Sequence, residues 1–247
     1  GTKMRDDALS SLRMEVALRQ AVERNEFELR YQPIVELASS KLVGFEALVR
    51  WRHPRRDLVS PAEFIPIAEQ TGLIVPLGRW VLETALHQQA RWRTDARMDG
   101  LNLSVNVSAR QFRQDDFVPQ MLQLLAQTGA NPERIKLELT ESLLLQDVDS
   151  VIATMHALKQ HGLGFSLDDF GTGYSSLSYL KRLPLDQIKI DQGFVRDVLL
   201  DASDAAIARS IIALAGSLGL SVIAEGVETT AHHQFLLAHG CQAFQGY

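Results

Sequence analysis

Seven side chains that could bind metal ions or handle protons follow or interrupt apolar runs in this 247-residue chain. Five are acids, one is an amide and one is a lysine. An ionised carboxylate buried without a cation costs several kcal/mol, so acids that converge inside a fold need a compensating ion. The pattern therefore predicts a metal site, and its candidate residues are Glu46, Asn106, Glu138, Asp168, Asp169, Lys189 and Glu225.

The adjacent pair Asp168 and Asp169 indicates the kind of ion. Two carboxylates so close repel each other unless a divalent cation lies between them. Ligands that are all oxygen favour Mg²⁺, Mn²⁺ or Ca²⁺ over Zn²⁺. Neighbouring side chains of a strand point to opposite sides. We therefore expect one aspartate to face the interior of the fold and the other to reach over the rim toward a second ion.

Taken singly, several of these residues have an ordinary structural explanation. A glutamate on a strand face, such as Glu46, is usually solvated. Asn106 and Glu138 each precede an expected helix, where they could cap its N-terminus. Lys189 could be a structural counter-charge, or it could orient a water or a phosphate oxygen. Only the combination of these residues indicates chemistry.

The elements that must position these residues alternate along the chain. A polar helix at 6–24 leads into two β-rich runs joined by a turn too short for a parallel crossover, so these two strands should be antiparallel. Ser60 and Pro61 are typical of a helix start. Strands are expected at residues 27–37, 41–51, 101–107, 134–140, 163–168, 185–190, 220–224 and 241–244. Helices are expected from 61, at 76–92, up to 127, and at 149–161, 175–181, 203–218 and 229–239.

This order predicts an α/β fold, a TIM-like (β/α)8 barrel with one antiparallel strand. Within the strands, apolar residues alternate with polar ones: Leu103 and Val105 oppose Ser104 and Asn106. Amphipathic helices should cover the apolar face, so the polar face must point into the barrel. The candidate residues then gather at the C-terminal ends of the strands, where barrel enzymes place their active sites.

Composition sets the broad class. The chain is 46% hydrophobic and 22% charged, and its net charge of −5 provides no general attraction to nucleic acid polymers or anionic membranes. Residues 1–25 form a lead-in helix, a possible connection from an upstream domain, and residues 26–247 form one barrel domain. Cys241 is alone, which fits a reducing compartment and a core position. His232 and His233 are expected on the surface of the last helix.

The motifs in this order resemble the EAL family of cyclic di-GMP phosphodiesterases, named for the triplet that stands here as Glu46-Ala47-Leu48. The resemblance runs over nearly the whole chain, from Tyr31-Gln32-Pro33 to Gln245-Gly246-Tyr247. Between these ends, the segments that carry it are Leu139-Thr140-Glu141-Ser142, Asp168 through Tyr174, and Ile188-Lys189-Ile190-Asp191.

The resemblance implies a role for each matching residue. Glu46, Asn106, Glu138 and Asp168 hold one divalent ion, and Asp168 with Asp169 serves a second. Glu46, Lys189, Glu225 and Gln245 form the catalytic set, with Lys189 and Glu225 contacting the attacking water. Gln32 and Arg50 contact guanine and phosphate of the substrate. Glu141 anchors a mobile loop at 168–176.

The resemblance also implies the reaction. Two Mg²⁺ or Mn²⁺ ions would activate a water that opens cyclic di-GMP to linear pGpG, and Ca²⁺ would bind without supporting turnover. The alternative is a receptor that binds cyclic di-GMP without cleaving it, but such receptors commonly lose a metal or loop residue, and here the set is complete. Discounting the resemblance leaves a third possibility, a metal-dependent barrel that acts on another phosphodiester.

The resemblance extends to partners and location. A homodimer is expected, as is fusion to sensor or diguanylate cyclase domains in the full-length protein. The expected location is the cytoplasm, either as a soluble protein or as the cytoplasmic part of a membrane-anchored protein. Family members usually continue beyond Gln-Gly-Tyr into a terminal helix, so barrel closure near Gln245 is the part of the fold that the sequence leaves open.

Overall fold

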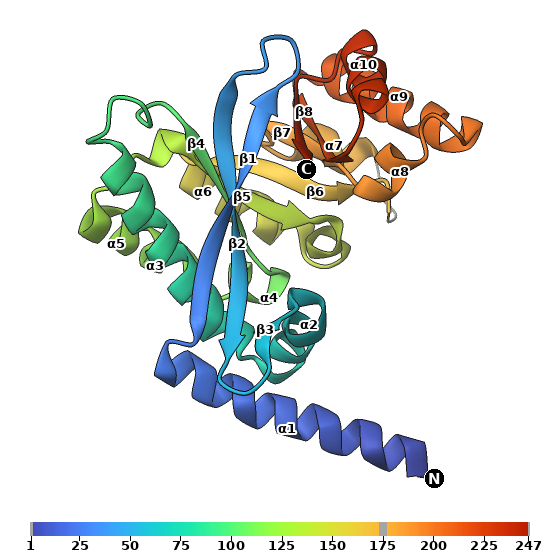
Figure 1. Ribbon diagram of the computed structural model, residues 1–247. Helices are drawn as coiled ribbons and strands as arrows, with labels where there is room; N and C mark the ends of the chain where they lie inside the picture. Colours follow the sequence, from blue (N-terminus) through green and yellow to red (C-terminus); the bar gives the residue numbers. More distant parts are fainter. Residues whose placement is uncertain (1, 173–176, 247) are drawn as a thin grey trace.

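One sheet runs through the whole chain and closes on itself. The computed structural model describes residues 2–172 and 177–246. In these residues eight strands close a barrel in the order β1-β9-β8-β7-β6-β5-β4-β2, with β1 paired to β2 and the short β3 added outside β2 (Figure 1). The strands are β1 Phe27–Glu36, β2 Leu42–His53, β3 Asp57–Val59, β4 Asn102–Asn106, β5 Ile135–Thr140, β6 Gly164–Phe170, β7 Gln187–Ile190, β8 Ser221–Val227 and β9 Ala243–Gly246.

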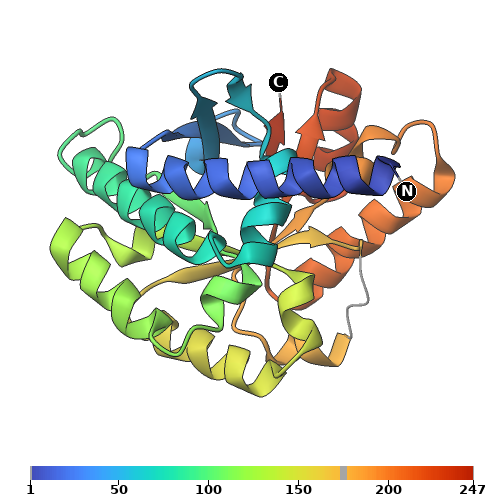
Figure 2. The ribbon, with the colours of Figure 1, turned by 90° about the horizontal axis from the view of Figure 1, so that it is seen from below.

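Helices surround this barrel (Figure 2). They are α1 Thr2–Arg24, α2 Pro61–Thr71, α3 Ile74–Trp92, α4 Ala109–Phe112, α5 Phe117–Thr128, α6 Val148–Lys159, α7 Leu177–Arg182, α8 Gln192–Arg196, α9 Ala202–Ser217 and α10 Thr230–Ala238, with short 3₁₀ turns η1 Pro132–Arg134 and η2 Glu141–Leu145. In the part of the chain described here, no helix combines the length and the apolar character that a membrane span requires.

Strand β1 is antiparallel to both of its neighbours, β2 and β9, whereas the pairs from β2 through β4 to β9 are parallel. A tight turn joins β1 to β2, with Ser40 N donating to Glu36 O at 2.9 Å and Ser40 in the left-handed region. So short a turn can only join antiparallel strands. The expected barrel with one antiparallel strand is therefore confirmed.

The barrel interior is polar, as the alternation predicted. Leu103 and Val105 are fully buried in the apolar core, while Ser104 and Ser166 are equally buried polar residues of the other face. Gln187 links this layer, since its amide nitrogen donates to Ser166 Oγ at 3.0 Å and its oxygen accepts from Lys136 Nζ at 3.1 Å. These bonds satisfy groups that would otherwise be costly to bury.

Helix caps settle one alternative for the candidate residues. Ser60 caps α2, as expected, by accepting from Ala62 N. At α4 the capping side chain is Ser108, whose Oγ accepts from Gln111 N at 3.1 Å. Asn106 lies two residues earlier and instead donates to Glu46. Asn106 is therefore not a cap, and its side chain belongs to the barrel mouth.

Several boundaries differ from the expectation. Strand β2 continues past the expected end at 51 to His53, because its last residues pair with the unexpected β3; Glu46 lies inside the strand, as it does in the expected range. Strands β8 and β9 both run further toward the C-terminus, since each continues pairing across an irregularity. The start of the helix expected at 175–181 lies outside the described residues, and the rest is α7.

Two side chains of the C-terminal region had an expected burial: Cys241 in the core and His232 on the surface. Cys241 is buried, as expected. The prediction for His232 was wrong, because its side chain is buried and its Nε2 lies 3.2 Å from Arg196 O. The ring fills the space between α10 and the end of α8. Since α8 was not expected from the sequence, neither was this burial.

Candidate metal and substrate site

Strand register brings the predicted residues to one mouth of the barrel. Asn106 is the Cα partner of Glu138, and Gln32 is the partner of Glu46. Asp168 pairs with Thr140, two residues beyond Glu138. All these strands except β1 are parallel, so their C-terminal parts share one rim. The structure therefore brings together acids that are up to 179 positions apart, from Glu46 to Glu225.

Lys189 lies at the centre of this group and is fully buried. Its Nζ donates to Glu46 Oε1, to Glu138 Oε2 at 3.0 Å and to Glu225 Oε1 at 2.7 Å. The nearest oxygen of Asp168 is 3.9 Å away. A single ammonium thus faces four carboxylates, which leaves the cluster with an excess of negative charge.

A second group of acids stands closer to solvent. One oxygen from each of Asp168, Asp169 and Glu225 lies within 4.8 Å of the others. Strict alternation would send Asp168 and Asp169 to opposite faces, but the strand is irregular at this point. The pairing of β6 with β7 shifts between Leu167 and Phe170, and Asp169 adopts a positive φ of 54°. This bulge turns both carboxylates toward the mouth.

The electrostatics show how crowded these acids are. Burial, reinforced by Asp168, raises the pKa of Asp169 to about 6. Burial also raises the pKa of Glu225 to about 8, although Lys189 opposes this shift. The pKa of Glu138 is raised well above its usual range because the carboxyl is completely buried. Burial alone would raise the pKa of Glu46, but its contacts with Lys189 and Asn106 outweigh burial and lower it.

The donor set fits hard divalent cations. Glu138 Oε1 is buried and has no hydrogen-bond partner in the described part of the protein. An ionised oxygen in that position needs a cation or a proton. The surrounding donors are carboxylate and amide oxygens, the ligands that Mg²⁺ and Mn²⁺ prefer. These residues therefore fit the metal that the sequence predicted.

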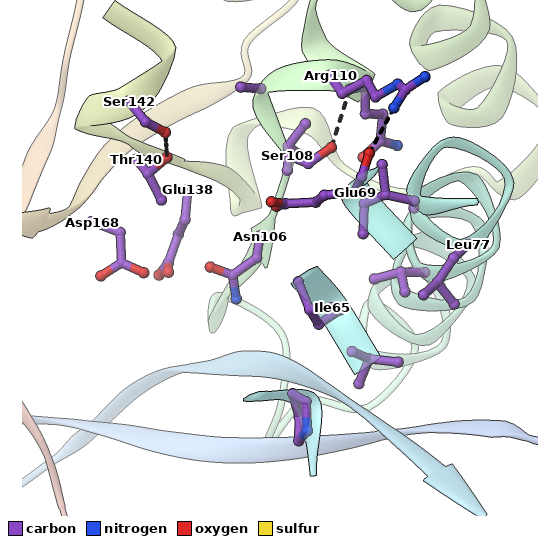
Figure 3. Close-up of a pocket in the computed structure, with 18 of the residues that line it drawn as sticks. Ile65, Glu69, Leu77, Asn106, Ser108, Arg110, Glu138, Thr140, Ser142 and Asp168 are labelled. Atoms are coloured by element: carbon purple, nitrogen blue, oxygen red, sulfur yellow. Dashed lines mark hydrogen bonds between the residues drawn. The ribbon is translucent and has the colours of Figure 1, made fainter. Parts of the chain in front are cut away.

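A cavity of about 660 Å³ opens beside the acids. Asn106, Glu138 and Asp168 point into it from the strand ends, while Ile65 and Leu77 line its opposite wall on α2 and α3 (Figure 3). Its volume lies within the range of small-molecule sites, which combine apolar walls with a few placed polar groups. Arg50 also lines the cavity, as do Ala47 and Leu48 next to Glu46.

Comparison with known proteins identifies the architecture. The family model described as the EAL domain matches residues 15–247. The chain belongs to the EAL domain family. A solved structure of the PaMucR phosphodiesterase in complex with c-di-GMP superposes with a TM-score of 0.91 at 44% identity, covering 95% of this chain and 94% of that one. The FimX EAL domain from Pseudomonas aeruginosa bound to c-di-GMP gives 0.83 at 25% identity, covering 95% and 93%.

Curated relatives of this EAL domain are longer proteins. MucR of P. aeruginosa, a bifunctional diguanylate cyclase/cyclic di-GMP phosphodiesterase, is 43% identical over 246 residues, which is 100% of this chain and 36% of MucR. The cyclic di-GMP phosphodiesterase NbdA of the same organism is 42% identical over 240 residues, which is 97% of this chain and 30% of NbdA. The chain thus spans about a third of the length of such relatives.

Gln245 ties the last strand of the EAL domain to the mouth. Its Nε2 donates to Glu46 Oε1 at 3.1 Å and to Gln32 Oε1 at 3.1 Å. Its own Oε1 is buried and has no partner among the residues described. Strand β9 therefore closes the barrel and also positions a polar side chain next to Glu46. Tyr247, the end of the predicted motif, lies outside the described residues.

Glu141 lies on η2 and is almost completely buried. Its Oε1 accepts a hydrogen bond from Gly171 N at 3.0 Å, just after the two aspartates. Gly171 has a positive φ of 97°, a conformation that glycine adopts without strain. This contact fixes the backbone where β6 ends. The remainder of the predicted loop, residues 173–176, lies outside the described part.

Sequence reasoning missed several residues of the cavity. Arg110 and Arg113 line it from α4 and the residue after α4, each held by backbone carbonyls: Arg110 Nη1 donates to Glu69 O at 2.6 Å, and Arg113 Nη2 donates to Leu143 O at 2.6 Å. Thr140 and Ser142, with oxygens 2.8 Å apart, line it as well. Thr140 and Ser142 lie in a segment that carries the family resemblance, but that segment gave no role to them; for Arg110 and Arg113 the available signal was a position following β4, which many structural residues share.

Proposed function

We propose that this EAL domain hydrolyses one phosphodiester bond of cyclic di-GMP and releases linear pGpG. The main observation in support is the cluster of Asp168, Asp169 and Glu225, in which one oxygen of each residue lies within 4.8 Å of the others. The cluster lies beside a cavity large enough for a dinucleotide. Relatives with 41–43% identity are named cyclic di-GMP phosphodiesterases, and the PaMucR structure contains c-di-GMP. Both findings support this substrate.

Two divalent cations, Mg²⁺ or Mn²⁺, would bind at the mouth. Glu46, Asn106, Glu138 and Asp168 would hold one ion, and Asp168 with Asp169 would serve the other. When bound, such ions lower the pKa of a water and offset charge on the scissile phosphate. Two observations support this assignment: Glu138 Oε1 has no hydrogen-bond partner among the described residues, and burial beside Asp168 raises the pKa of Asp169. Ca²⁺ would bind without supporting turnover.

The protein's own groups then manage the water and its proton. Glu225 is partly exposed and receives a hydrogen bond from Lys189, so its free edge can orient the attacking water or accept its proton. Lys189 keeps Glu46, Glu138 and Glu225 in fixed positions. Gln245 orients Glu46, and its buried Oε1, which has no partner among the described residues, would accept from the same water. Attack of the water oxygen at phosphorus would break the bond to the 3′ oxygen, which would take up a proton from solvent as the ring opens.

Substrate contacts would come from the cavity walls. Arg50, which lines the cavity, would pair with a phosphate, and Gln32 would contact guanine near the mouth. Glu141 would link this chemistry to the segment after Asp169 through its bond to Gly171. In the cell, we expect a cytoplasmic homodimer fused to sensor or diguanylate cyclase domains. The tandem activities named for MucR are consistent with such a fusion.

The decisive experiment is turnover of cyclic di-GMP by the purified chain in Mg²⁺ or Mn²⁺, with pGpG measured by chromatography. Glu46→Ala should abolish the product. Tight binding of cyclic di-GMP without pGpG in Mn²⁺ would instead identify a receptor. Cleavage of unrelated phosphodiesters at an equal rate would contradict the proposed specificity. The complete acid set around Lys189 favours hydrolysis over the receptor.

A further inference from the structure

Lys189 pairs with the same carboxylates that are proposed to bind metal ions. Glu46, Glu138 and Asp168 are proposed ligands, and Glu225 adjoins them. All four lie within 4.0 Å of the buried Nζ. Lysine is rarely buried completely unless it is paired. Here the pairing is strong enough to raise the pKa of Lys189 well above its usual range despite burial.

The lysine uses only part of each acid. It contacts Glu46 Oε1, while Glu46 Oε2 accepts from Asn106 Nδ2 at 3.1 Å. It contacts Glu138 Oε2, while Glu138 Oε1 has no partner in the described residues. Lys189 therefore leaves the second oxygen of each acid to another partner, which is the Asn106 amide at Glu46 and is missing at Glu138 among the described residues. Lys189 and a metal ion would neutralise the same negative charges from two sides.

The geometry points to Lys189 as a resident cation that holds the acids in place without metal and weakens divalent-ion binding by competing for their charge. This inference rests on the proposed metal-dependent function. Two cations that share ligands repel each other, and each gains less when the other is present. The domain would therefore fold with an intact site before metal arrives. The fraction of sites that hold metal would then change with the free ion concentration, whereas a tighter site would stay fully occupied.

Lys136 provides a matched control. It is another lysine that faces the barrel interior, and it lies on β5 two residues before Glu138. Burial lowers its pKa. Its Nζ donates to Gln187 Oε1 at 3.1 Å. Within the described residues, no carboxylate lies within 4.0 Å of it. Lys136→Met makes the same substitution in the same barrel and removes one positive charge. It leaves the acid cluster around Lys189 intact.

The test is calorimetric titration of Mg²⁺ and Mn²⁺ into the wild type, Lys189→Met and Lys136→Met, with no substrate present. Lys189→Met should bind metal about tenfold more tightly, a typical coupling between two sites. Lys136→Met should stay within about twofold. A purely structural role for Lys189 predicts the opposite, since loosened acids bind metal more weakly. Equal or weaker binding by Lys189→Met therefore overturns the inference. If the wild type bound no metal, the proposed metal site itself would be wrong.

A wild-type measurement covers the case in which Lys189→Met does not fold without metal. Buried ammonium groups exchange protons slowly, so the Lys189 and Lys136 Nζ signals can be followed by ¹⁵N NMR, with Lys136→Met assigning the second. Adding Mg²⁺ should shift the Lys189 signal and leave that of Lys136 in place. An unchanged Lys189 signal at saturating Mg²⁺ would show that the two cations do not share ligands, against the inference.

Discussion

At the scale of single residues, Glu138 carries the strongest chemical signal. Its side chain is completely buried, one oxygen pairs with Lys189, and the other has no partner in the described chain. Burial raises the pKa of Glu138 well above its usual range, so the ionised carboxylate needs a further cation beside this oxygen. A buried carboxylate with one unpaired oxygen is the state expected of a ligand whose cation is supplied from solution.

Glu138→Gln should keep the shape of this side chain and remove its charge. We expect turnover to fall at least ~100-fold, because a metal ligand contributes several kcal/mol to the transition state. Product formation and calorimetric metal titration would both measure the effect. Glu63→Gln is the control, since Glu63 is exposed and its side chain pairs with Arg56 on the surface. Full activity of Glu138→Gln would show that Glu138 is not a metal ligand.

The raised pKa values of Glu225, about 8, and Asp169, about 6, predict how the metal-free protein responds to pH. Between about pH 4 and pH 8 the folded state binds more protons than the unfolded state, so stability must fall as pH rises. The lowered pKa of Glu46 and the raised pKa of Lys189 act outside this window.

Thermal unfolding in a chelator should therefore give a lower Tm at pH 8.5 than at pH 5, by several degrees. In Glu225→Gln the titrating group is gone, and the difference should shrink. A Tm that rises across this window in the wild type, or an identical slope in the variant, would contradict the assignment.

At the scale of elements, two strand irregularities build the site. The shift in β6 brings Asp168 and Asp169 to the same rim, and a similar shift in β8 between Ala224 and Val227 lies around Glu225. Gly226 in that stretch has a φ of 71°. Bulges re-aim side chains that strict alternation would separate. The metal cluster thus depends on backbone conformation as much as on side-chain identity.

Gly171→Ala tests this dependence. A Cβ there would lie 2.9 Å from Phe194 Cε2 and 3.3 Å from Ile211 Cδ1, and φ is 97°. The substitution should displace the end of β6 and reduce both metal affinity and turnover. Gly129→Ala shares the positive φ but meets nothing within 4 Å. It should cost only about 1 kcal/mol of unfolding free energy in urea, with activity unchanged. Equal losses in both variants would exclude a specific effect of the bulge.

At the scale of the whole molecule, closure of the barrel brings its first and last strands together at the site. Gln245 on β9 contacts Gln32 on β1 across 213 positions, and it also contacts Glu46 on β2. Because so many elements meet at the excess negative charge, ions that neutralise it should stabilise the entire fold. Metal binding and global stability are therefore coupled.

Addition of Mg²⁺ to about 100 times its dissociation constant should stabilise the protein by ~2.7 kcal/mol for each site. In a chain of this size that corresponds to a rise in Tm of roughly 5–10 °C, measurable by calorimetry. Ca²⁺ should also raise Tm while producing no pGpG. Glu138→Gln should lose most of the shift. An unchanged Tm in the wild type at millimolar Mg²⁺ would count against the site.

Local pattern was enough to predict the barrel, the antiparallel first strand, the polar lumen and the mouth at which the acids gather. Period-2 alternation and short turns are read within a few residues, and the motif order carried the family resemblance. The tertiary structure alone decided the rest. The irregularity in β6 that brings Asp168 and Asp169 together, the burial of His232 and the four acids around Lys189 all depend on contacts between separate segments. No local pattern encodes such contacts, because each depends on where a remote strand or helix finally packs.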